Sequence, residues 1–438
     1  MTRDELKAKV VETIDTRRDY LVELGTRLLK IPELGYKEHK SAAIVAEEFS
    51  KLGLEYRKNL AITGLKANLS GKRKGPRVAV LGELDAVVCP GHPYADPVTG
   101  AAHACGHNGQ LTSMLGVAMG LVHSGAMQHL DGDVAVMAVP AEEPVEIEFR
   151  QKLREQGKIR FLGGKQELIA LGEFDDVDMA MMVHMSVQEK GFKARMGGTA
   201  NGFLAKLIKY RGKEAHAGGA PHLGVNALNA AMLGLFGIHA QRETFKDDDS
   251  IRVHPIITKG GDLVNVIPAD VRIETYVRGK SISGILDASK KVNRALRAGA
   301  MATGAEVEIL EIPGFLPVDN NAALSGVFRE NLEALVGHEA VMDAHHGAGS
   351  TDMADVMKIM PAIHPYIGGA SGRGHSEDYV IEDPDLAYII PAKAMAMSVV
   401  DLLYDGASVA GKILCEYEPE FTKETYLKMW DELTRPEE

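Results

Sequence analysis

Short runs of consecutive apolar residues alternate along this chain with stretches in which apolar residues return every three or four positions. The runs include Val78 to Leu81, Val134 to Val139 and Met179 to Val183. Runs of this length are typical of buried parallel strands, and the stretches between them predict helices at 41–51, 109–124 and 164–171. The pattern predicts an α/β domain whose strands end at a common edge of one sheet.

The N-terminal residues 1–30 carry apolar side chains at helical spacing among many charges. This pattern predicts one amphipathic surface helix and argues against a signal peptide. No segment approaches the roughly 18–20 consecutive apolar residues of a membrane-spanning helix. We therefore expect a soluble protein that does not enter a membrane.

From about Arg195 the pattern changes to alternating strands and longer helices. It predicts a strand within 203–212, a helix at 226–239, strands at 251–258 and 270–277, a helix at 282–300 and a strand at 307–312. This β-α-β-β-α-β order is that of a ferredoxin-like unit. After about Pro313 the first pattern returns, with helices at 321–336 and 384–403 and a glycine-rich turn at 368–374. We expect a discontinuous domain of residues 1–194 and 314–438, interrupted by an inserted domain of residues 195–313.

Composition narrows the possible functions. The chain has 438 residues, 45% of them hydrophobic, and a formal net charge of −12. A net negative charge disfavours binding to nucleic acid or to anionic membranes. The cysteines are few and odd in number, which favours a reducing compartment over a disulfide framework. We expect a cytoplasmic protein.

Ionisable side chains follow the predicted strands. Glu83 and Asp85 come after the first strand, Glu142 and Glu143 after the second and His184 after the third, while Cys105 and His107 stand in the segment HACGHN before a helix. His375 lies on the late glycine-rich segment. Thiolate and imidazole ligands suit zinc and related transition metals.

Each of these segments alone also fits an ordinary structural role. HACGHN could be a glycine turn with a buried cysteine, PAEEP (140–144) a solvated acidic turn, His184 a core residue and His375 part of an exposed turn. Their combination favours chemistry, because an α/β fold gathers strand ends at one place. Five such ligands are enough for two metal ions, and Glu142 would act as a general base.

The motifs resemble those of the aminoacylase and carboxypeptidase-like metal-dependent amidohydrolases. The resemblance is greatest to the branch that contains auxin-conjugate, hippurate and aminobenzoyl-glutamate hydrolases. The matching segments are IPEL (31–34), ELDA (83–86), HACGHN (103–108), PAEEP (140–144), His184, GKEAHAGGAP (212–221), NVIP (265–268), GSTDM (349–353) and HSEDY (375–379). The resemblance implies a zinc-peptidase-like catalytic domain, with a mixed sheet between helices, and an inserted lid and dimerisation domain.

The resemblance also implies the role of each site residue. Cys105 would bridge two divalent ions, zinc or manganese, with His107 and His184 on one ion and Glu143 and His375 on the other. Glu142 would be the general base. His216 would reach the active site of the neighbouring subunit in a homodimer and stabilise the oxyanion.

Three further residues are weaker candidates for the site. Asn265 and Arg278 are candidates for holding the substrate's carboxylate or oxyanion, although an exposed strand arginine is usually only solvated. We expect Asp85 to orient a ligating imidazole, because metal-bound histidines need such a partner.

The sequence departs from the family pattern at Asn108 and Gln110, where many members have Asp and His. Loss of a carboxylate there would weaken one ion, so a one-metal site stays open. The charged insert 146–164, with Arg150, Arg154 and Arg160, either shapes a pocket for an acidic substrate or forms a charged surface helix.

We expect hydrolysis of the amide bond in an N-acyl or N-aroyl amino acid or a dipeptide, which is a small-molecule substrate. One alternative is hydrolytic deamination of an aromatic amine, as in the 5-nitroanthranilate aminohydrolase type. A less favoured one is a non-catalytic binding protein with the same fold.

Overall fold

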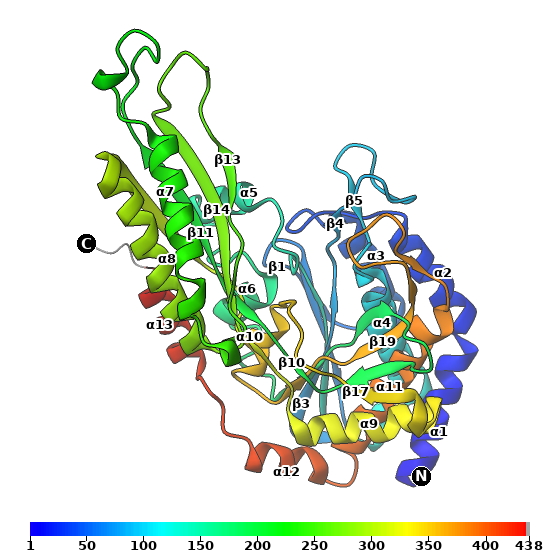
Figure 1. Cartoon of the computed structure of the whole chain (residues 1–438). Helices are drawn as coiled ribbons and strands as arrows, with labels where there is room; N and C mark the ends of the chain where they lie inside the picture. Colours follow the sequence, from blue (N-terminus) through cyan, green and yellow to red (C-terminus); the bar gives the residue numbers. More distant parts are fainter. Residues whose placement is uncertain (435–438) are drawn as a thin grey trace. The chain divides into compact units, whose positions relative to one another are not determined.

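The computed structural model describes residues 1–434 and divides them into two compact units (Figure 1). The first unit consists of residues 1–198, 319–345 and 355–423. The second consists of residues 199–318 and 346–354, together with 424–434 of the described residues. The last four residues of the predicted domain 314–438 lie outside the described part.

The first unit is built on a six-stranded mixed sheet. Its order is β1 (Tyr56–Leu60), β2 (Gly64–Ser70), β6 (Asp131–Val139), β3 (Arg73–Glu83), β7 (Met179–Met181) and β18 (Ala362–Ile363). The strands β6, β3, β7 and β18 run parallel to one another, and β2 is antiparallel to β1 and β6. The central residues of β3 and β6 are fully buried, as continuous apolar runs require. The predicted α/β fold with a mixed sheet is confirmed.

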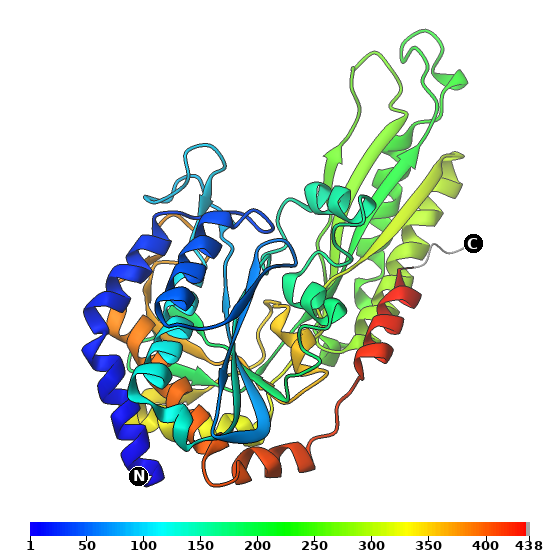
Figure 2. The ribbon, with the colours of Figure 1, turned by 180° about the vertical axis from the view of Figure 1, so that it is seen from behind.

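Helices lie on both faces of this sheet (Figures 1 and 2). One face carries α1 (Arg3–Thr16), α2 (Arg18–Leu29), α3 (His39–Lys51), α4 (His107–Ser124) and α11 (Ile390–Leu403). The other carries α5 (Ile147–Glu155) and α6 (Gly164–Leu171). The remaining helices are α9 (Ala322–Val336), α10 (Met353–Met357), α12 (Ser408–Glu416) and, in the second unit, α13 (Lys423–Leu433).

The stretch Asp385–Leu403 is long and apolar enough to cross a membrane by length and composition. In the structure 94% of its most apolar window is buried inside the protein. It begins with a π-helical turn, Asp385–Ile389, before α11. Pro391 has no N–H to donate to the Ala387 carbonyl, which the Ser113 hydroxyl approaches at 3.5 Å. The stretch is therefore a core helix of this unit.

A second sheet and a short hairpin complete the first unit. The sheet has the order β17 (Val341–Asp343), β9 (Ala194–Met196), β19 (Tyr366–Ser371) and β20 (Val380–Ile381), and β8 (His184–Val187) pairs in parallel with β19. The hairpin joins β4 (Val87–Val88) to β5 (Ala101–Ala102). These short elements lie next to the loops that carry the candidate ligands.

The second unit has the predicted β-α-β-β-α-β order. Its elements are β11 (Gly202–Arg211), α7 (Ala227–Ala240), β12 (Arg252–Val253), β13 (Ile256–Lys259), β14 (Asp270–Gly279), α8 (Ile282–Thr303) and β15 (Glu306–Pro313). The sheet is antiparallel, with β14 and β15 on either side of β11 and with β12 and β13 paired to β14. Two very short strands, β10 (Thr199–Ala200) and β16 (Val318–Asp319), stand at the ends of this stretch of chain.

The prediction of one N-terminal helix is wrong. Two helices, α1 and α2, meet at Arg17. The Thr16 hydroxyl donates to the Thr13 carbonyl at 2.7 Å, and the Arg17 N–H turns to the Ile14 carbonyl instead. A threonine hydroxyl that competes for a backbone acceptor ends the first helix.

Three other predicted elements differ in their limits. The run 179–183 is a strand only to Met181, and His184 opens β8 in the other sheet rather than ending a strand. The strand predicted at 251–258 is split into β12 and β13 around Pro255, which has no N–H for a ladder. The glycine-rich segment 368–374 belongs to β19 as far as Ser371.

Gly25 permits α2 to approach the core closely, and this contact can be tested. A Cβ atom at Gly25 would lie 2.6 Å from the Tyr388 ring and 2.9 Å from Thr112 Oγ1. We expect Gly25→Ala to lower the free energy of unfolding by about 1–2 kcal/mol through overpacking. The matched control is Gly326→Ala in α9, where a Cβ meets nothing within 4 Å, and it should stabilise by about 0.5–1 kcal/mol. Urea unfolding measures both, and equal effects would contradict this account.

Candidate metal centre

Every predicted metal ligand lies in the first unit, on segments that follow its strands. Cys105 and His107 come from the loop and the first turn of α4, and Glu143 comes from the turn after β6. His184 opens β8, and His375 lies between β19 and β20. The structure therefore brings together five side chains that are far apart in the sequence.

The loop that presents Cys105 is shaped by Gly106. This residue has a φ of 81°, and a Cβ atom there would lie 2.5 Å from the Tyr379 hydroxyl oxygen. Only glycine meets both conditions at low cost. The tight turn points Cys105 and His107 to the same place.

Cys105 lies between two groups of potential ligands. Its Sγ is 3.4 Å from His184 Nε2 and 3.3 Å from His375 Nε2. His375 Nε2 is in turn 3.1 Å from Glu143 Oε1. Two sets, Cys105 with His107 and His184 and Cys105 with Glu143 and His375, have donor atoms within 4.8 Å of one another. The thiol is the member that the two sets share.

The imidazole of His107 is fixed in one tautomer. Its Nδ1 is 2.9 Å from the Asp85 carbonyl oxygen and 3.3 Å from Asp85 Oδ1. A carbonyl can only accept, so Nδ1 carries a proton and Nε2 is the nitrogen that faces the other candidate ligands. Asp85 also accepts the Glu143 N–H at 2.9 Å through Oδ2. Asp85 thus contacts two of the candidate ligands.

Sequence reasoning assigned no specific role to Glu83, which lies beside His107, and did not identify its partner Lys165. Glu83 Oε2 is 3.1 Å from His107 Nε2, and Lys165 Nζ donates to Glu83 Oε1 at 2.5 Å. Glu83, His107 and Glu142 form a third set of potential ligands. Glu83 stood in the sequence as one of the strand-end carboxylates, but nothing there distinguished it from a solvated one.

His364 was also missed, because it stands in no recognisable motif. Its ring lies 5.6 Å from the ring of His184, and it is buried. Burial, together with the charge of His184, lowers the pKa of His364 to about 3. It is therefore a neutral imidazole beside the cluster.

Burial and neighbouring charges shift the pKa values of the residues in the cluster. Burial, assisted by Glu143, raises the pKa of the Cys105 thiol well above its usual value. A hydrogen bond to Glu143 raises the pKa of His375. Burial lowers the pKa of His184 to about 4. The protein alone therefore does not favour a thiolate here, and a thiolate needs a cation beside it.

The turn that carries Glu142 and Glu143 is held from two sides. Ala141 has a φ of 54°, and its N–H donates to Glu38 Oε1 at 2.8 Å. Burial and the nearby Asp85 raise the pKa of Glu38 to about 7. On the other side, Arg150 donates to the carbonyl oxygens of Glu143 at 2.5 Å and Ala141 at 3.3 Å.

Arg150 corrects one expectation about the charged insert. Residues 147–155 do form a helix, α5, but the Arg150 side chain is 1% exposed and also donates to the Leu162 carbonyl at 2.8 Å. Its guanidinium stacks over the Tyr36 ring at 5.5 Å. Arg150 is therefore a buried support of the acidic turn and not a surface residue, whereas Arg154 and Arg160 are partly exposed.

Asn108 and Gln110 have structural partners. The Asn108 side-chain amide donates to the Gly25 carbonyl at 3.3 Å and to the Tyr388 hydroxyl at 3.0 Å. The Gln110 side-chain carbonyl accepts the Glu83 N–H at 3.2 Å. Asn108 thus connects α4 to its neighbours, and Gln110 fixes the end of β3.

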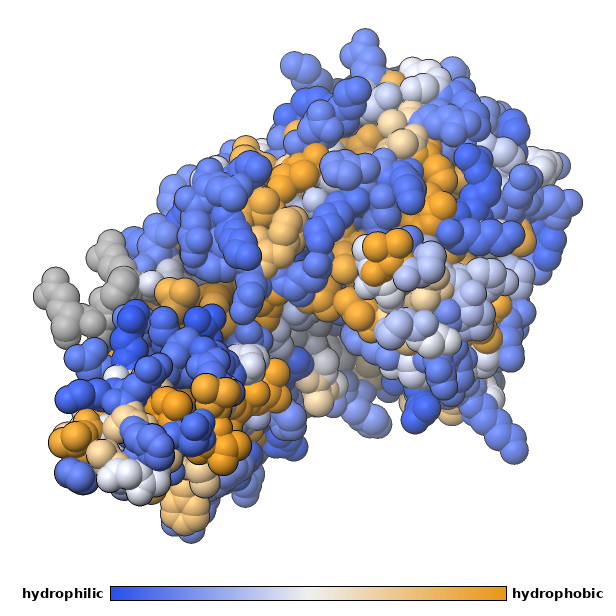
Figure 3. Space-filling model, turned by 90° about the horizontal axis from the view of Figure 1, so that it is seen from above, coloured by the Kyte–Doolittle hydropathy of each residue, from blue (hydrophilic) through white to orange (hydrophobic). Residues whose placement is uncertain are grey.

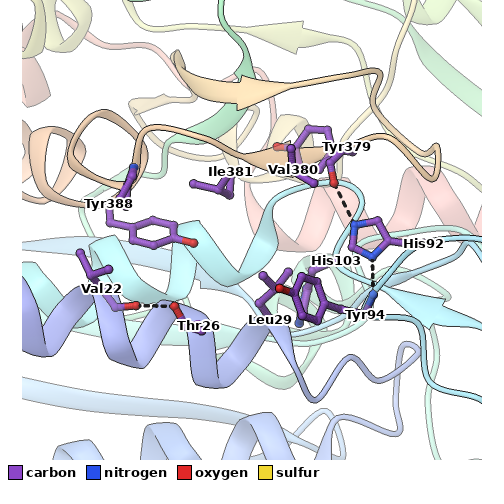
Figure 4. A pocket seen from close by; sticks show the side chains of 11 residues that line it. Val22, Thr26, Leu29, His92, Tyr94, His103, Tyr379, Val380, Ile381 and Tyr388 are labelled. Atoms are coloured by element: carbon purple, nitrogen blue, oxygen red, sulfur yellow. Dashed lines mark hydrogen bonds between the residues drawn. The ribbon is translucent and has the colours of Figure 1, made fainter.

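The histidine that opens the HACGHN motif faces a different place. His103 helps to line a pocket of about 270 Å³ between α2 and the segment 379–388, together with His92, Tyr94 and Tyr388 (Figure 4). His92 Nε2 lies 2.8 Å from the Tyr379 carbonyl oxygen. None of the predicted ligands is among the described residues that line this pocket. His103 is therefore not part of the ligand cluster.

The remaining predicted site residues lie in the second unit. His216 is exposed, and its Nδ1 accepts the N–H groups of Gly218 at 3.2 Å and Gly219 at 2.9 Å. Asn265 is also exposed, and its carbonyl accepts the Ala217 N–H at 2.9 Å. Arg278 is half-buried, with its guanidinium over the rings of Phe203 and Tyr276.

The donor set fits one or two divalent transition-metal ions. It offers sulfur, imidazole nitrogen and carboxylate oxygen, which together suit zinc and its neighbours. Buried atoms at its centre, Glu83 Oε2 and His107 Nε2, have no hydrogen-bond partner within residues 1–434. Buried polar atoms of this kind need a partner. A bound cation would supply it.

Comparison with known proteins gives consistent results across the chain. A sequence model of peptidase family M20/M25/M40 matches residues 79–394. The Xaa-Arg dipeptidase of Mus musculus is 30% identical over 427 residues, covering 93% of this chain and 91% of that protein. The IAA-amino acid hydrolase ILR1-like 2 of Arabidopsis thaliana is 26% identical over 388 residues, covering 84% and 82%.

Solved structures share the fold. The Bacillus subtilis YxeP protein, described as a dinuclear metal-binding peptidase, has a TM-score of 0.67 at 21% identity and covers 89% of this chain and 99% of its own. The aminobenzoyl-glutamate utilization protein of Klebsiella pneumoniae has a TM-score of 0.68 at 20% identity and covers 89% and 97%. At these identities the likeness concerns the fold alone.

The support that Arg150 gives to the acidic turn can be tested. We expect Arg150→Met to lower the free energy of unfolding by about 2–3 kcal/mol, because it leaves buried carbonyl groups without their charged donor. The control is Lys152→Met, an exposed position on the same helix, which should change stability by less than about 0.5 kcal/mol. Urea unfolding of both variants gives the comparison. An unchanged free energy of unfolding in Arg150→Met would show that the turn does not need this side chain.

Proposed function

Because this chain belongs to peptidase family M20/M25/M40, whose members are hydrolases that cleave C–N bonds, we propose that it hydrolyses the amide bond of a small substrate. The substrate would be a dipeptide or an N-acyl or N-aroyl amino acid. The observation that carries the proposal is the cluster in which Cys105 is shared by two sets of metal-ligating side chains, with Glu142 beside them.

The proposed ligand assignment follows the two sets. Cys105, His107 and His184 would hold one divalent ion, and Cys105, Glu143 and His375 would hold the other. Zinc and manganese are the metals that we propose. When bound, such ions polarise a carbonyl group and lower the pKa of a water molecule.

Glu142 is the proposed general base. It is 6% exposed, and its carboxylate belongs to the set with Glu83 and His107. Its partner in the turn, Glu143, is engaged with His375. Glu142 would take a proton from the water that attacks the amide carbonyl and deliver it to the leaving nitrogen. Asp85 would hold the His107 ring in its Nδ1–H tautomer during these steps.

The relatives narrow the proposed substrates. Their names refer to a dipeptidase, to a hydrolase of amino-acid conjugates and to the use of aminobenzoyl-glutamate. All of these compounds join an acyl group to the nitrogen of an amino acid. We propose that Asn265 and Arg278 hold the free carboxylate of such a substrate. The half-buried guanidinium of Arg278, held over two rings, suits an anion.

We propose that residues 195–313 are a lid and dimerisation domain inserted into a catalytic domain of residues 1–194 and 314–438. Apolar side chains gather on the surface of the second unit (Figure 3). They include Met232, Leu233 and Phe236 on α7 and Ile256 and Ile257 on β13, and Phe236 is 74% exposed. Exposed apolar side chains of this number favour a homodimer contact.

His216 would act across this dimer, in the active site of the partner subunit. Its Nδ1 accepts two backbone N–H groups, so the neutral ring carries its proton on Nε2. The exposed Nε2–H is then a donor for the oxyanion that develops at the carbonyl.

The sparse cysteines also support our proposal of a cytoplasmic location.

The proposed reaction predicts the behaviour of Glu142→Gln. We expect this variant to bind zinc or manganese as the wild type does but to lose at least about a hundredfold in kcat, because it cannot accept a proton. Metal content by mass spectrometry and hydrolysis of a panel of dipeptides and acyl-amino acids measure the two effects. Full activity of the variant would contradict the mechanism. Release of ammonia from an aminobenzoate, with no amide hydrolysed, would favour the deaminase alternative.

The proposed dimer predicts complementation between inactive variants. His216→Ala and Glu142→Gln should each be inactive alone, and after mixing they should recover about a quarter of wild-type activity, because half of the random dimers hold one complete site. Phe236→Glu should shift the protein to a monomer in light scattering. The control Leu171→Glu, at an exposed apolar position of the first unit, should leave the mass unchanged. No recovery in mixed dimers would contradict action across the dimer.

A further inference from the structure

We infer that Glu83 is an additional protein ligand of the ion at His107, with Lys165 as its fixed counter-charge. This inference rests on the proposed metal centre. It adds a carboxylate that neither the motifs nor the family resemblance assigns to the site. It also gives a role to a buried ion pair that the proposed reaction does not use.

The first argument concerns two buried atoms that face each other, His107 Nε2 and Glu83 Oε2. His107 donates its Nδ1–H to the Asp85 carbonyl, so Nε2 is the nitrogen that can bind a metal ion. Lys165 Nζ binds Glu83 Oε1, which leaves Oε2 directed at His107, 3.1 Å from Nε2. Neither atom has a hydrogen-bond partner in the described part of the chain, and both residues are at most 1% exposed. Two buried lone pairs at this distance repel each other unless a cation, either a proton or a metal ion, lies between them.

The second argument concerns distance. Two ligands bound to one zinc ion at roughly 2.0–2.2 Å stand about 3–3.5 Å apart when they subtend an angle between an octahedral and a tetrahedral one. The separation of 3.1 Å between His107 Nε2 and Glu83 Oε2 lies in this range. So does the separation of 3.1 Å between His375 Nε2 and Glu143 Oε1, which belong to the other proposed ion. The Glu83 contact thus has the spacing of ligands on a shared ion.

The third argument concerns the fixed position of Glu83. Lys165 is completely buried, and a buried ammonium group requires a charged or strongly polar partner. The Gln110 side chain accepts the Glu83 N–H, so the backbone is held as well as the carboxylate. One oxygen is thereby committed to Lys165, and the other remains for the ion. A carboxylate that only balanced Lys165 would not need its second oxygen aimed at a ligating imidazole.

The two proposed ions would then differ in their ligands. Glu83 would add a carboxylate to the ion at His107, since its oxygen belongs to one set of mutually close donor atoms with His107 and Glu142, whereas the other ion would keep Cys105, Glu143 and His375. An added carboxylate ligand holds an ion more tightly and leaves it fewer open positions. We therefore expect the ion at His107 to be the more tightly bound one.

The test compares metal binding of the wild type with that of Glu83→Gln and of the double variant Glu83→Gln/Lys165→Met. The double variant removes both charges, so it avoids an unpaired buried lysine. The matched control is Lys206→Met/Glu311→Gln, which removes another buried lysine and its carboxylate partner from the second unit. Each full-length protein is titrated with zinc against a competing chelator and then with cobalt(II), whose visible spectrum reports its ligands. Circular dichroism confirms that each variant is folded.

We expect both Glu83 variants to bind the tightest ion at least about tenfold more weakly than the wild type does, and to show an altered cobalt spectrum. The control should bind as the wild type does. Unchanged affinities and spectra in folded Glu83 variants, beside a wild type that binds metal, would overturn the inference and leave the proposed function intact. A wild type that binds no metal would overturn both.

Discussion

The candidate site depends on the close grouping of ionisable side chains near the ends of β3 and β6. A thiol, imidazoles and carboxylates lie close together there, and the carboxylates and His107 are buried, whereas Cys105 and His184 are partly buried and His375 is exposed. Folding such groups together costs free energy because charged and polar atoms lose hydration, and attractive contacts such as His375 with Glu143 oppose this cost. Further hydrogen bonds to Asp85 fix His107 and Glu143 in place. The protein therefore has the arrangement that a bound metal would stabilise.

The architecture explains how these polar side chains are held close together. The C-terminal halves of β3 and β6 are buried and mostly apolar, so the chain can turn sharply at their ends without losing the core. Two of these turns use left-handed backbone, at Gly106 and at Ala141. Glu38 and Arg150 hold the second turn, and Asp85 connects it to His107. Hydrophobic packing thus provides the rigid frame, and backbone hydrogen bonds position the polar groups upon it.

Much of this arrangement could be predicted from the sequence. The apolar runs at 78–81 and 134–139 located the two strands, and the motifs correctly identified the family, because both signals are local in the chain. The family match and the fold agree with that prediction. The gathering of Cys105, His107, Glu143, His184 and His375 followed from the rule that strand ends meet at one edge.

Other features could not be predicted, because they depend on contacts between distant residues. Glu83 and Lys165 form an ion pair although they lie 82 residues apart in the sequence. Neither residue stands in a pattern that marks it as buried. Arg150 looked like a surface charge because its helix is polar on most sides. The break at Arg17 arises from one threonine hydroxyl, which competes with the backbone in a way that residue spacing does not reveal.

The way in which Arg150 holds the acidic turn has a consequence for how this protein can change. The guanidinium recognises only main-chain carbonyl groups, at positions 141, 143 and 162. The side chains at those positions are therefore free to vary as far as this contact is concerned, whereas the helix that carries the arginine is not dispensable. The charged insert thus supports the acidic turn that precedes it in the sequence, and shortening it would remove that support.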